Sequence, residues 1–156
     1  MHLHQLQREK GFTLIEILIV VAIIGILASV VLVGLGPVQR QGRDSRRISD
    51  LRQVQNGLEL YFNRNGRYPA GTTWTDLRTA ILGGGIGVSN MPNDPRNVAP
   101  YIYLYGTDAG GSSYVLGAQL EDLDNPILRD DIDGIVNGVD CSDGASDTTP
   151  VYCVRI

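Results

Sequence analysis

One carboxylate stands out in this chain because it lies inside an apolar segment. Glu16 is the fifth residue of a mostly apolar block that begins at Phe12. A charged side chain deep in a bilayer costs roughly 2.5–3.5 kcal/mol on insertion scales, and less near the interface. A Glu that merely reaches the membrane surface would cost little, whereas a Glu that is buried needs a partner. The sequence therefore makes Glu16 a candidate functional residue.

The residues after Glu16 form a stretch long enough to cross a membrane as a helix. Between Ile17 and Leu35 the only polar side chain is Ser29. A bilayer core requires about 17–25 apolar residues in helical form. A conventional signal peptide has a shorter apolar stretch, of about 7–15 residues, with its cleavage site behind it. An ordinary single-span anchor and a conventional signal peptide are therefore the two plainer alternatives.

The residues around Glu16 resemble the type III signal of type IV prepilins and type II secretion pseudopilins. A short polar leader, residues 1–11, ends in two basic residues and Gly11, and Phe12 follows at the junction. The resemblance implies that a prepilin peptidase cleaves between Gly11 and Phe12 and that the new amino end of Phe12 is N-methylated. It also implies that Glu16 directs filament assembly and register.

The same resemblance implies the partners of the chain. In an assembling filament, Glu16 would pair with the cationic amine of Phe12 in a neighbouring subunit. Leaving either buried ion unpaired would cost roughly 3–5 kcal/mol, so subunits docked in the wrong axial register would be rejected. The implied partners are other copies of the chain in a helical homopolymer, the prepilin peptidase, a pilus assembly ATPase with its platform protein, and the cytoplasmic membrane before assembly.

The composition gives no support to catalysis or to nucleic-acid binding. Both histidines, His2 and His4, and the only lysine, Lys10, lie in the leader. The predicted mature chain therefore lacks histidine bases, histidine metal ligands and lysine Schiff bases. The formal net charge is −4, and removing the leader makes it more negative, so no nucleic-acid partner is required. We expect no enzyme, and an anchored enzyme that uses carboxylates is the remote alternative.

Two cysteines, Cys141 and Cys153, lie near the C-terminus and are the only ones in the chain. A bridge between them would contribute about 3 kcal/mol in the chain-entropy model, and it would place this region in an oxidising compartment. Two unpaired thiols are the alternative. A bridged C-terminal loop resembles that of many type IV pilins, whereas major pseudopilins more often lack it and rely on calcium there. The cysteines therefore favour a pilin.

The basic residues that flank the apolar segment oppose an orientation in which the C-terminus lies outside the cytoplasm. Two precede the segment and four follow it: Arg40, Arg43, Arg46 and Arg47. The positive-inside rule would place the C-terminus in the cytoplasm. The disulfide and the leader processing both require the opposite orientation, so we expect the C-terminus outside, and a periplasmic or extracellular filament after assembly. For the four arginines, a packing face between subunits and a solvated helix surface are equal interpretations.

An acidic stretch leads into the C-terminal region. Between Leu120 and Asp147 there are nine acidic residues and one basic residue. Calcium takes oxygen ligands of this kind, and major pseudopilins, which the chain resembles, bind calcium in the corresponding loop. The spacing does not match an Asp-x-Asp-x-Asp-Gly loop, however. We expect a solvated acidic loop and no cofactor, with calcium as the weaker alternative. The candidate ligands are Asp124, Asp130, Asp131 and Asp133.

Hydrophobic periodicity predicts an α+β fold. An amphipathic helix is expected over residues 38–65, with Asn65-Gly66 as its stop, and a short helix over 74–82 with Thr73 or Thr75 as its cap. Strands are expected over 101–105, 113–120 and 151–155. In the first strand, alternation separates the tyrosines from Ile102 and Leu104, and we expect this aliphatic face to lie on the long helix.

These elements and the resemblance together predict three parts. Residues 1–11 are the leader, 12–36 a transmembrane and filament-core helix, and 37–156 a globular head that includes the C-terminal half of the long helix. The fold implied is that of a type IV pilin: a long, protruding N-terminal helix packed on a small antiparallel sheet.

The function that these patterns indicate is that of a building block. We expect a structural pilin of a type IV pilus-like surface filament that serves adhesion, twitching or DNA uptake. A major pseudopilin of a type II secretion system, a minor pilin at the filament tip and the anchored enzyme are the open alternatives.

Overall fold

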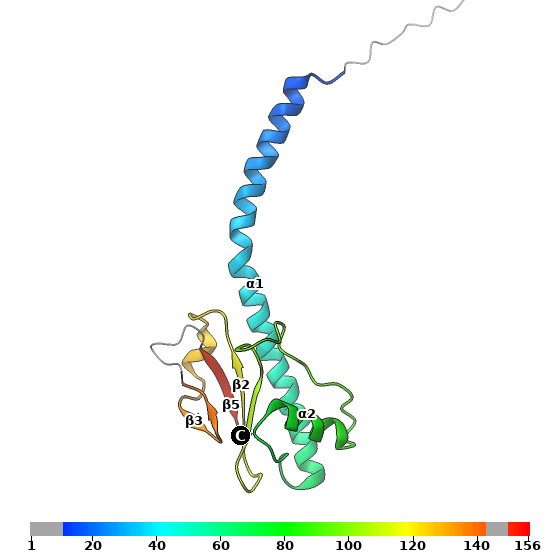
Figure 1. Cartoon of the computed structure of the whole chain (residues 1–156), viewed down its shortest axis with the longest axis vertical. Helices are drawn as coiled ribbons and strands as arrows, with labels where there is room; N and C mark the ends of the chain where they lie inside the picture. Colours follow the sequence, from blue (N-terminus) through cyan, green and yellow to red (C-terminus); the bar gives the residue numbers. More distant parts are fainter. Residues whose placement is uncertain (1–10, 143–149) are drawn as a thin grey trace, which may run out of the picture. The chain divides into compact units, whose positions relative to one another are not determined.

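A computed structural model describes residues 11–142 and 150–156 (Figure 1). The described part has an α+β fold, as the sequence predicted, and it divides into two compact units at Val38 and Gln39. The helices and strands, in chain order, are α1 Leu14–Asn65, α2 Trp74–Gly83, β1 Leu104–Thr107, β2 Tyr114–Gln119, a 3-10 turn η1 Pro126–Arg129, β3 Ile135–Val136, β4 Val139–Asp140 and β5 Val151–Arg155.

The first helix, α1, is a single element of 52 residues that continues through Pro37. Proline has no backbone N–H, so the helix lacks one of its hydrogen bonds at this position. The helix ends at Asn65, and Gly66 follows with a φ of 69°, a left-handed conformation that favours glycine. The stop that the sequence predicted at Asn65-Gly66 is confirmed.

In the second unit, the part of α1 after Gln39 supplies one side of the hydrophobic core. Leu51, Val54 and Leu58 recur at helical spacing and are all buried. Tyr103 and Tyr105 pack in the same cluster, whereas Ile102 is exposed. The prediction that the aliphatic face lies on the helix is therefore wrong.

Tyr103 and Tyr105 can be buried because the hydroxyl of each finds an acceptor. The hydroxyl of Tyr103 donates to Asp50 Oδ2 of α1 at 2.7 Å, and the hydroxyl of Tyr105 donates to the carbonyl oxygen of Pro69 at 2.5 Å. A buried hydroxyl without a partner would be costly, while a satisfied one lets the large ring be buried. Burial, aided by the bond to Asp50, raises the pKa of Tyr103 well above its usual value.

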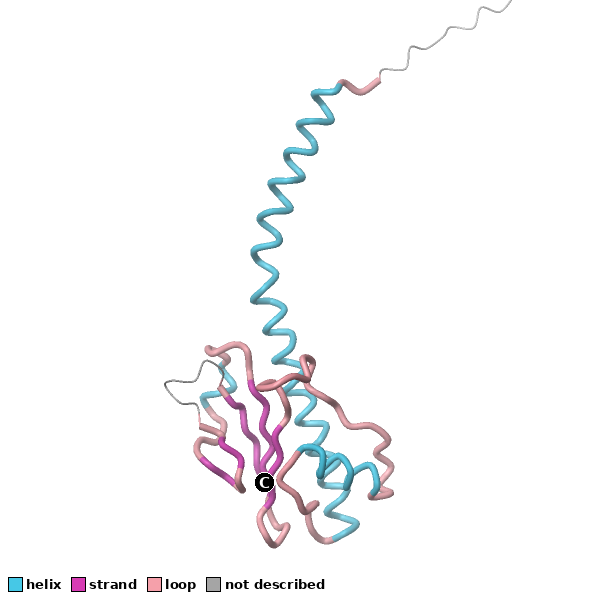
Figure 2. Tube along the Cα trace, in the orientation of Figure 1, coloured by secondary structure: helices cyan, strands magenta, loops and turns pink. Residues whose placement is uncertain are grey.

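The sheet of the second unit has three antiparallel strands in the order β1–β2–β5 (Figure 2). On β2, Leu116 belongs to the helix-side core, and its neighbour Val115 belongs to a smaller cluster around the two cysteines. Side chains alternate between the faces of a strand, so α1 and the disulfide lie on opposite faces of the sheet. Gly117 is paired with Cys153, and a Cβ at Gly117 would lie 3.3 Å from Cys153 Sγ, so the glycine leaves room for the disulfide.

The strand predicted over 101–105 begins later than expected. The observed strand β1 is Leu104–Thr107, and Val98 and Tyr101 form an isolated bridge around Ala99-Pro100. Because a proline cannot donate to a strand ladder, the segment before β1 turns instead of pairing. The other two strands, β2 and β5, lie within the predicted ranges.

A small hairpin, β3–β4, was not predicted. Its turn is Asn137-Gly138, with φ angles of 48° and 81°, which is the dipeptide favoured in tight hairpins. The turn packs on the backbone of β1, because a Cβ at Gly106 would lie only 2.3 Å from the carbonyl oxygen of Asn137. Glycine at position 106 thus permits the close approach of the hairpin.

Candidate functional site

The start of α1 is closed by a reciprocal pair of hydrogen bonds between Thr13 and Glu16. The backbone N–H and the hydroxyl of Thr13 both donate to Glu16 Oε2, at 2.8 and 2.7 Å, and the backbone N–H of Glu16 donates back to Thr13 Oγ1 at 3.3 Å. The carbonyl oxygen of Thr13 accepts the first helical bond from Ile17. This is a capping box, in which a Thr and a Glu three residues later satisfy the free N–H groups of a helix start.

The capping box gives Glu16 a role that the sequence reasoning missed. The signal was present, because Thr-Leu-Ile-Glu ahead of an apolar run is a capping-box pattern. Both contacts from Thr13 go to one carboxylate oxygen, Oε2. The second oxygen, Oε1, makes no hydrogen bond within the described ranges and can accept from another group.

The other two predicted site residues, Gly11 and Phe12, lie just before the helix. Both are outside regular structure, and the Phe12 side chain is 83% exposed. No neighbouring atom lies within 4 Å of the position that a Cβ on Gly11 would take. The structure therefore brings Gly11, Phe12 and Glu16 into one exposed segment of little more than a helical turn.

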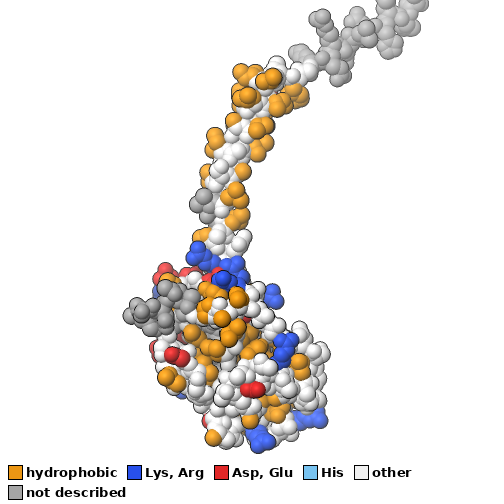
Figure 3. All heavy atoms as spheres, in the orientation of Figure 1, with side chains coloured by type: hydrophobic (Ala, Val, Ile, Leu, Met, Phe, Trp, Pro, Cys, Tyr) orange, Lys and Arg blue, Asp and Glu red, His pale blue; other side chains and the backbone are white. Residues whose placement is uncertain are grey.

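The first half of α1 is apolar and uncovered in the single chain. Within the described residues, α1 is one helix that is long and apolar enough to cross a membrane, and none of that stretch is buried. Figure 3 shows hydrophobic side chains along the face of this half that is in view. Between Ile17 and Leu35 the one polar side chain, Ser29, donates its hydroxyl to the carbonyl oxygen of Gly25 at 2.7 Å, so its polar hydrogen is satisfied within the helix. Such a surface needs lipid or other apolar helices against it.

A buried ion cluster, which we define as Arg43, Asp44, Arg47, Asp94 and Glu121, joins α1 to two distant segments. The fully buried Arg47 donates to Asp94 at 2.6 and 3.1 Å, to Asp44 at 2.7 Å and to Glu121 at 2.9 Å. Asp44 in turn accepts the backbone N–H of Glu121 at 3.0 Å. The cluster thus fixes both the loop after α2 and the segment after β2 to the helix.

Charge pairing in this cluster is reflected in the acidity of Glu121. Arg43 donates to both carboxylate oxygens of Glu121, at 2.7 and 2.5 Å. Hydrogen bonds from Arg43 and Arg47, opposed by burial, lower the pKa of Glu121 to about 2. Neither interpretation of the arginines from the sequence fits Arg43 and Arg47, which are partners within the fold.

Cys141 and Cys153 form a disulfide, as predicted. Both are buried, and the bridge links the segment after β4 to the middle of β5. The alternative of two unpaired thiols is excluded. The segment 143–149 that the bridge encloses lies outside the described residues.

The acidic residues before the first cysteine do not gather into a metal site in the described ranges. Asp131 accepts the backbone N–H of Cys153 on β5 at 3.0 Å, while Asp124, Asp130 and Asp133 are exposed. No group of three or more histidine, cysteine or acidic side chains in residues 11–142 and 150–156 is placed to hold a metal ion. Asp131 caps a strand edge rather than joining the other three carboxylates.

Comparison with known proteins gives one family, both from a short motif and from longer alignments. A family model described as the prokaryotic N-terminal methylation motif matches residues 6–32. The type II secretion system core protein G of Klebsiella pneumoniae is 34% identical over 111 residues, which cover 71% of this chain and 76% of the relative. The corresponding protein of Escherichia coli (strain K12) is 37% identical over 114 residues, 70% of this chain and 72% of the relative.

A type IV pilin is also among the relatives. The type IV major pilin protein PilA of Myxococcus xanthus is 38% identical over 61 residues, which cover 39% of this chain and 28% of that protein. No solved structure matches the chain. The methylation motif, the exposed apolar helix with its capped start, the helix-on-sheet fold and these relatives agree, and the chain belongs to the family of type IV pilins and type II secretion pseudopilins.

Proposed function

We propose that this chain is the repeating subunit of a pilin-like filament of the type II secretion kind. The observation that carries the proposal is the uncovered apolar half of α1 with a carboxylate at its start. Relatives named type II secretion system core protein G, aligned over about 70% of the chain, support this class of filament. The role is structural, and no catalytic group is required for it.

The apolar half of α1 would serve as a membrane anchor before assembly and as the filament core afterwards. Burial of apolar surface contributes about 25 cal/mol per Å² when the surface leaves water. A helix that leaves lipid gains less, because lipid tails are as apolar as leucine, so close packing between helices must supply part of the association free energy. Self-assembly and leader removal by a prepilin peptidase are the steps that the family implies.

Cleavage between Gly11 and Phe12 would create the positive partner of Glu16. In the single chain, Thr13 occupies Oε2 of Glu16, which leaves Oε1 for a second donor. The methylated amine of Phe12 from a neighbouring subunit would donate to this oxygen. Pairing the two charges inside the apolar core would fix the axial register, since an unpaired ion there costs roughly 3–5 kcal/mol.

The C-terminal unit would lie outside the cytoplasm, as the buried disulfide supports. We place the unassembled chain in the cytoplasmic membrane and assign its extraction to an assembly ATPase and a platform protein. No nucleic acid and no cofactor is needed for this role. The exposed Asp124, Asp130 and Asp133 would be solvated, with calcium as the alternative.

A second candidate function, that of a type IV pilin, is favoured by one specific observation. The Cys141–Cys153 disulfide closes a C-terminal loop that resembles the bridged loop of many type IV pilins. A type IV pilin is also among the relatives. The two candidates differ in what a cell loses when the chain is absent, namely export of folded proteins or long surface fibres.

A deletion experiment separates the two functions. Cells that lack the chain would be imaged by electron microscopy and assayed for secreted proteins in the medium. Blocked export with unchanged surface fibres supports the secretion filament, and loss of all fibres with normal export supports the pilin. Mass spectrometry of the protein from its native cells tests the shared step, since a chain that still begins at Met1 would contradict both.

A further inference from the structure

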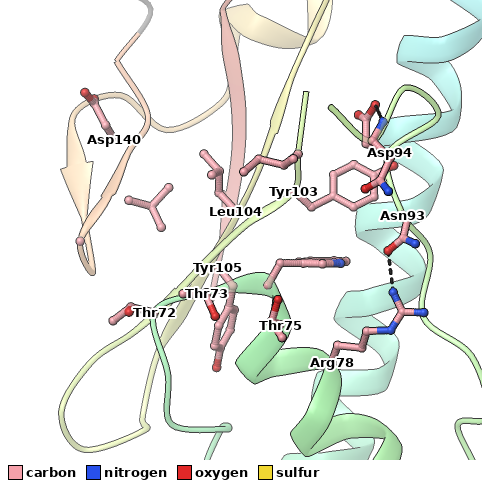
Figure 4. Close-up of a pocket in the computed structure, with 15 residues that line it drawn as sticks. Thr72, Thr73, Thr75, Arg78, Asn93, Asp94, Tyr103, Leu104, Tyr105 and Asp140 are labelled. Atoms are coloured by element: carbon pink, nitrogen blue, oxygen red, sulfur yellow. Dashed lines mark hydrogen bonds between the residues drawn. The ribbon is translucent and has the colours of Figure 1, made fainter. Parts of the chain in front are cut away.

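The second unit contains a pocket that the proposed filament function does not use. Its volume is about 530 Å³, within the range of roughly 300–1,000 Å³ found for small-molecule sites. The start of α2, the loop after it, β1 and β4 contribute the walls (Figure 4). All of these elements belong to one compact unit, so the pocket is formed within a single subunit.

One wall of the pocket is aromatic. Trp74 and Tyr103 both line it, and their rings meet edge to face with centroids 5.0 Å apart. Tyr103 is fixed by its hydrogen bond to Asp50, while Trp74 remains partly exposed. An aromatic face carries partial negative charge, which attracts the slightly positive hydrogens of C–H groups. This wall therefore suits a ligand with a flat C–H face.

Trp74 also carries an unused hydrogen-bond donor. Its indole nitrogen is buried, and no described residue accepts its N–H. A buried donor without an acceptor costs about 1–3 kcal/mol in the folded chain. Thr72 and Thr75, both exposed, add hydroxyl groups to the lining of the pocket (Figure 4).

The charges around the pocket are already paired or balanced. Asp94 is held by Arg47, and Arg78 donates to Asn93 Oδ1 at 2.6 Å. At the amino end of α2, the backbone N–H of Asp76 donates to Thr73 Oγ1, and the hydroxyl of Thr73 donates to Asp76 Oδ2. Across the pocket from Arg78 stands the exposed carboxylate of Asp140 (Figure 4). Arg78 and Asp140 are opposite in charge, so the lining favours neither a net anion nor a net cation.

We propose that this pocket binds a neutral sugar unit. A pyranose ring offers a C–H face for Trp74 and hydroxyl groups for the threonines and amides that line the pocket. A filament subunit with such a pocket would present one sugar site per copy. Many weak sites on one polymer bind a polysaccharide far more tightly than a single site does.

The single tryptophan of the chain makes the proposal directly measurable. Trp74 is the only tryptophan, so its fluorescence reports on the pocket alone. The full chain, purified in a polyoxyethylene detergent without sugar head groups, would be titrated with glucose, galactose and N-acetylglucosamine, and with sodium sulfate at equal concentration. We expect a saturable change in emission with at least one sugar and none with sulfate.

Two variants on the same helix provide a matched comparison. Thr75 lines the pocket and Thr79, one turn later, does not. By ligand-detected NMR, T75V is expected to weaken sugar binding about five- to tenfold, as for one lost hydrogen bond, and T79V to leave it unchanged. W74F, which keeps an aromatic ring but presents a smaller face to the sugar, is expected to weaken binding by a similar factor.

Three results would overturn the proposal. The first is no saturable response to any of the three sugars, and the second is a response to sulfate in their place. The third is equal sugar affinity in T75V, T79V and the unaltered chain. The T75V and T79V pair keeps the test decisive even where W74F does not fold, because both altered side chains are exposed.

Discussion

Arg47 of α1 and Asp94 of the loop after α2 form a two-point ion pair, with Nε 2.6 Å from Oδ2 and Nη2 3.1 Å from Oδ1. Both side chains are buried. A planar guanidinium is the only side chain that can make this parallel contact with a carboxylate and still reach two further acids. The pair therefore ties a loop that is distant in the sequence to the middle of the long helix.

Removal of Arg47 should destabilise the second unit strongly. In R47M the carboxylates of Asp44, Asp94 and Glu121 lose their shared cation, and a broken buried pair costs roughly 3–5 kcal/mol. Thermal and urea unfolding of the full chain in detergent measure the loss. The control is R40M on the same helix, where the side chain is exposed and the change should stay within about 0.5 kcal/mol. Equal midpoints for the two variants would contradict the structural role of the pair.

Acid should weaken the fold through Glu121. The pKa of Glu121 is lowered to about 2 from its usual value of 4.5, so the folded state favours the charged form more than the unfolded state does. The stabilisation is present above about pH 4.5 and is lost as the pH falls towards 2. The drop in melting temperature between pH 6 and pH 3 is therefore expected to be larger in the unaltered chain than in E121Q.

Asp108, whose pKa is also lowered to about 2 by hydrogen bonds from Ser113 and its neighbours, titrates in both proteins and cancels in that comparison. An identical acid sensitivity of E121Q and the unaltered chain would rule out Glu121 as the source of the difference.

Two substitutions at Glu16 should separate helix capping from charge pairing. Glutamine can replace glutamate in a capping box but carries no charge. In E16Q we expect slow amide exchange at the start of α1, as in the unaltered chain, together with a loss of filament assembly. In E16V both properties should be lost, with a helix-start penalty of about 0.5–2 kcal/mol. Amide exchange in micelles and sedimentation of assembled filaments are the two measurements. Normal filaments from E16Q would show that capping, not charge, is what assembly requires.

Gly106 should resist substitution although it lies in a strand. In G106A the new methyl group would meet the carbonyl oxygen of Asn137, which belongs to backbone and cannot rotate away. Overpacking of this kind typically costs about 1–3 kcal/mol. The matched variant is G83A at the end of α2, where no neighbouring atom lies within 4 Å, and it should be neutral or slightly stabilising. Chemical unfolding of both variants side by side gives the difference.

Reductant and chelator should have different effects on the fold. Reduction of Cys141–Cys153 should lower the free energy of unfolding by about 2–5 kcal/mol, the usual range for loss of a native disulfide from a small domain. A calcium chelator should leave the melting temperature unchanged, since Asp131 is engaged by β5 and the other candidate ligands are exposed. A lower midpoint in the presence of chelator, restored by added calcium, would instead establish the calcium alternative.

Elements whose signal is local could be predicted from the sequence. The stop of α1 at Asn65-Gly66 and the start of α2 after Thr73 are both confirmed, because caps act within a few residues. The disulfide was also predicted, since only one pairing exists for two cysteines. The hairpin at Asn137-Gly138 had an equally local signal, which was overlooked among the surrounding acids.

Features that depend on tertiary partners could not be predicted in this way. Alternation correctly separates Tyr103 and Tyr105 from their aliphatic neighbours, but it cannot say which face meets the helix. The choice depends on two acceptors, Asp50 Oδ2 and the carbonyl oxygen of Pro69, that lie far away in the sequence. The burial of Arg47 likewise depends on Asp94 and Glu121, whose approach no pattern around Arg47 reveals.

The hydroxyl of Ser29 turns inward to the carbonyl oxygen of Gly25, so the segment between Ile17 and Leu35 offers its surroundings no unmet side-chain donor. A change of surroundings from lipid chains to neighbouring helices would then break no side-chain hydrogen bond along this segment.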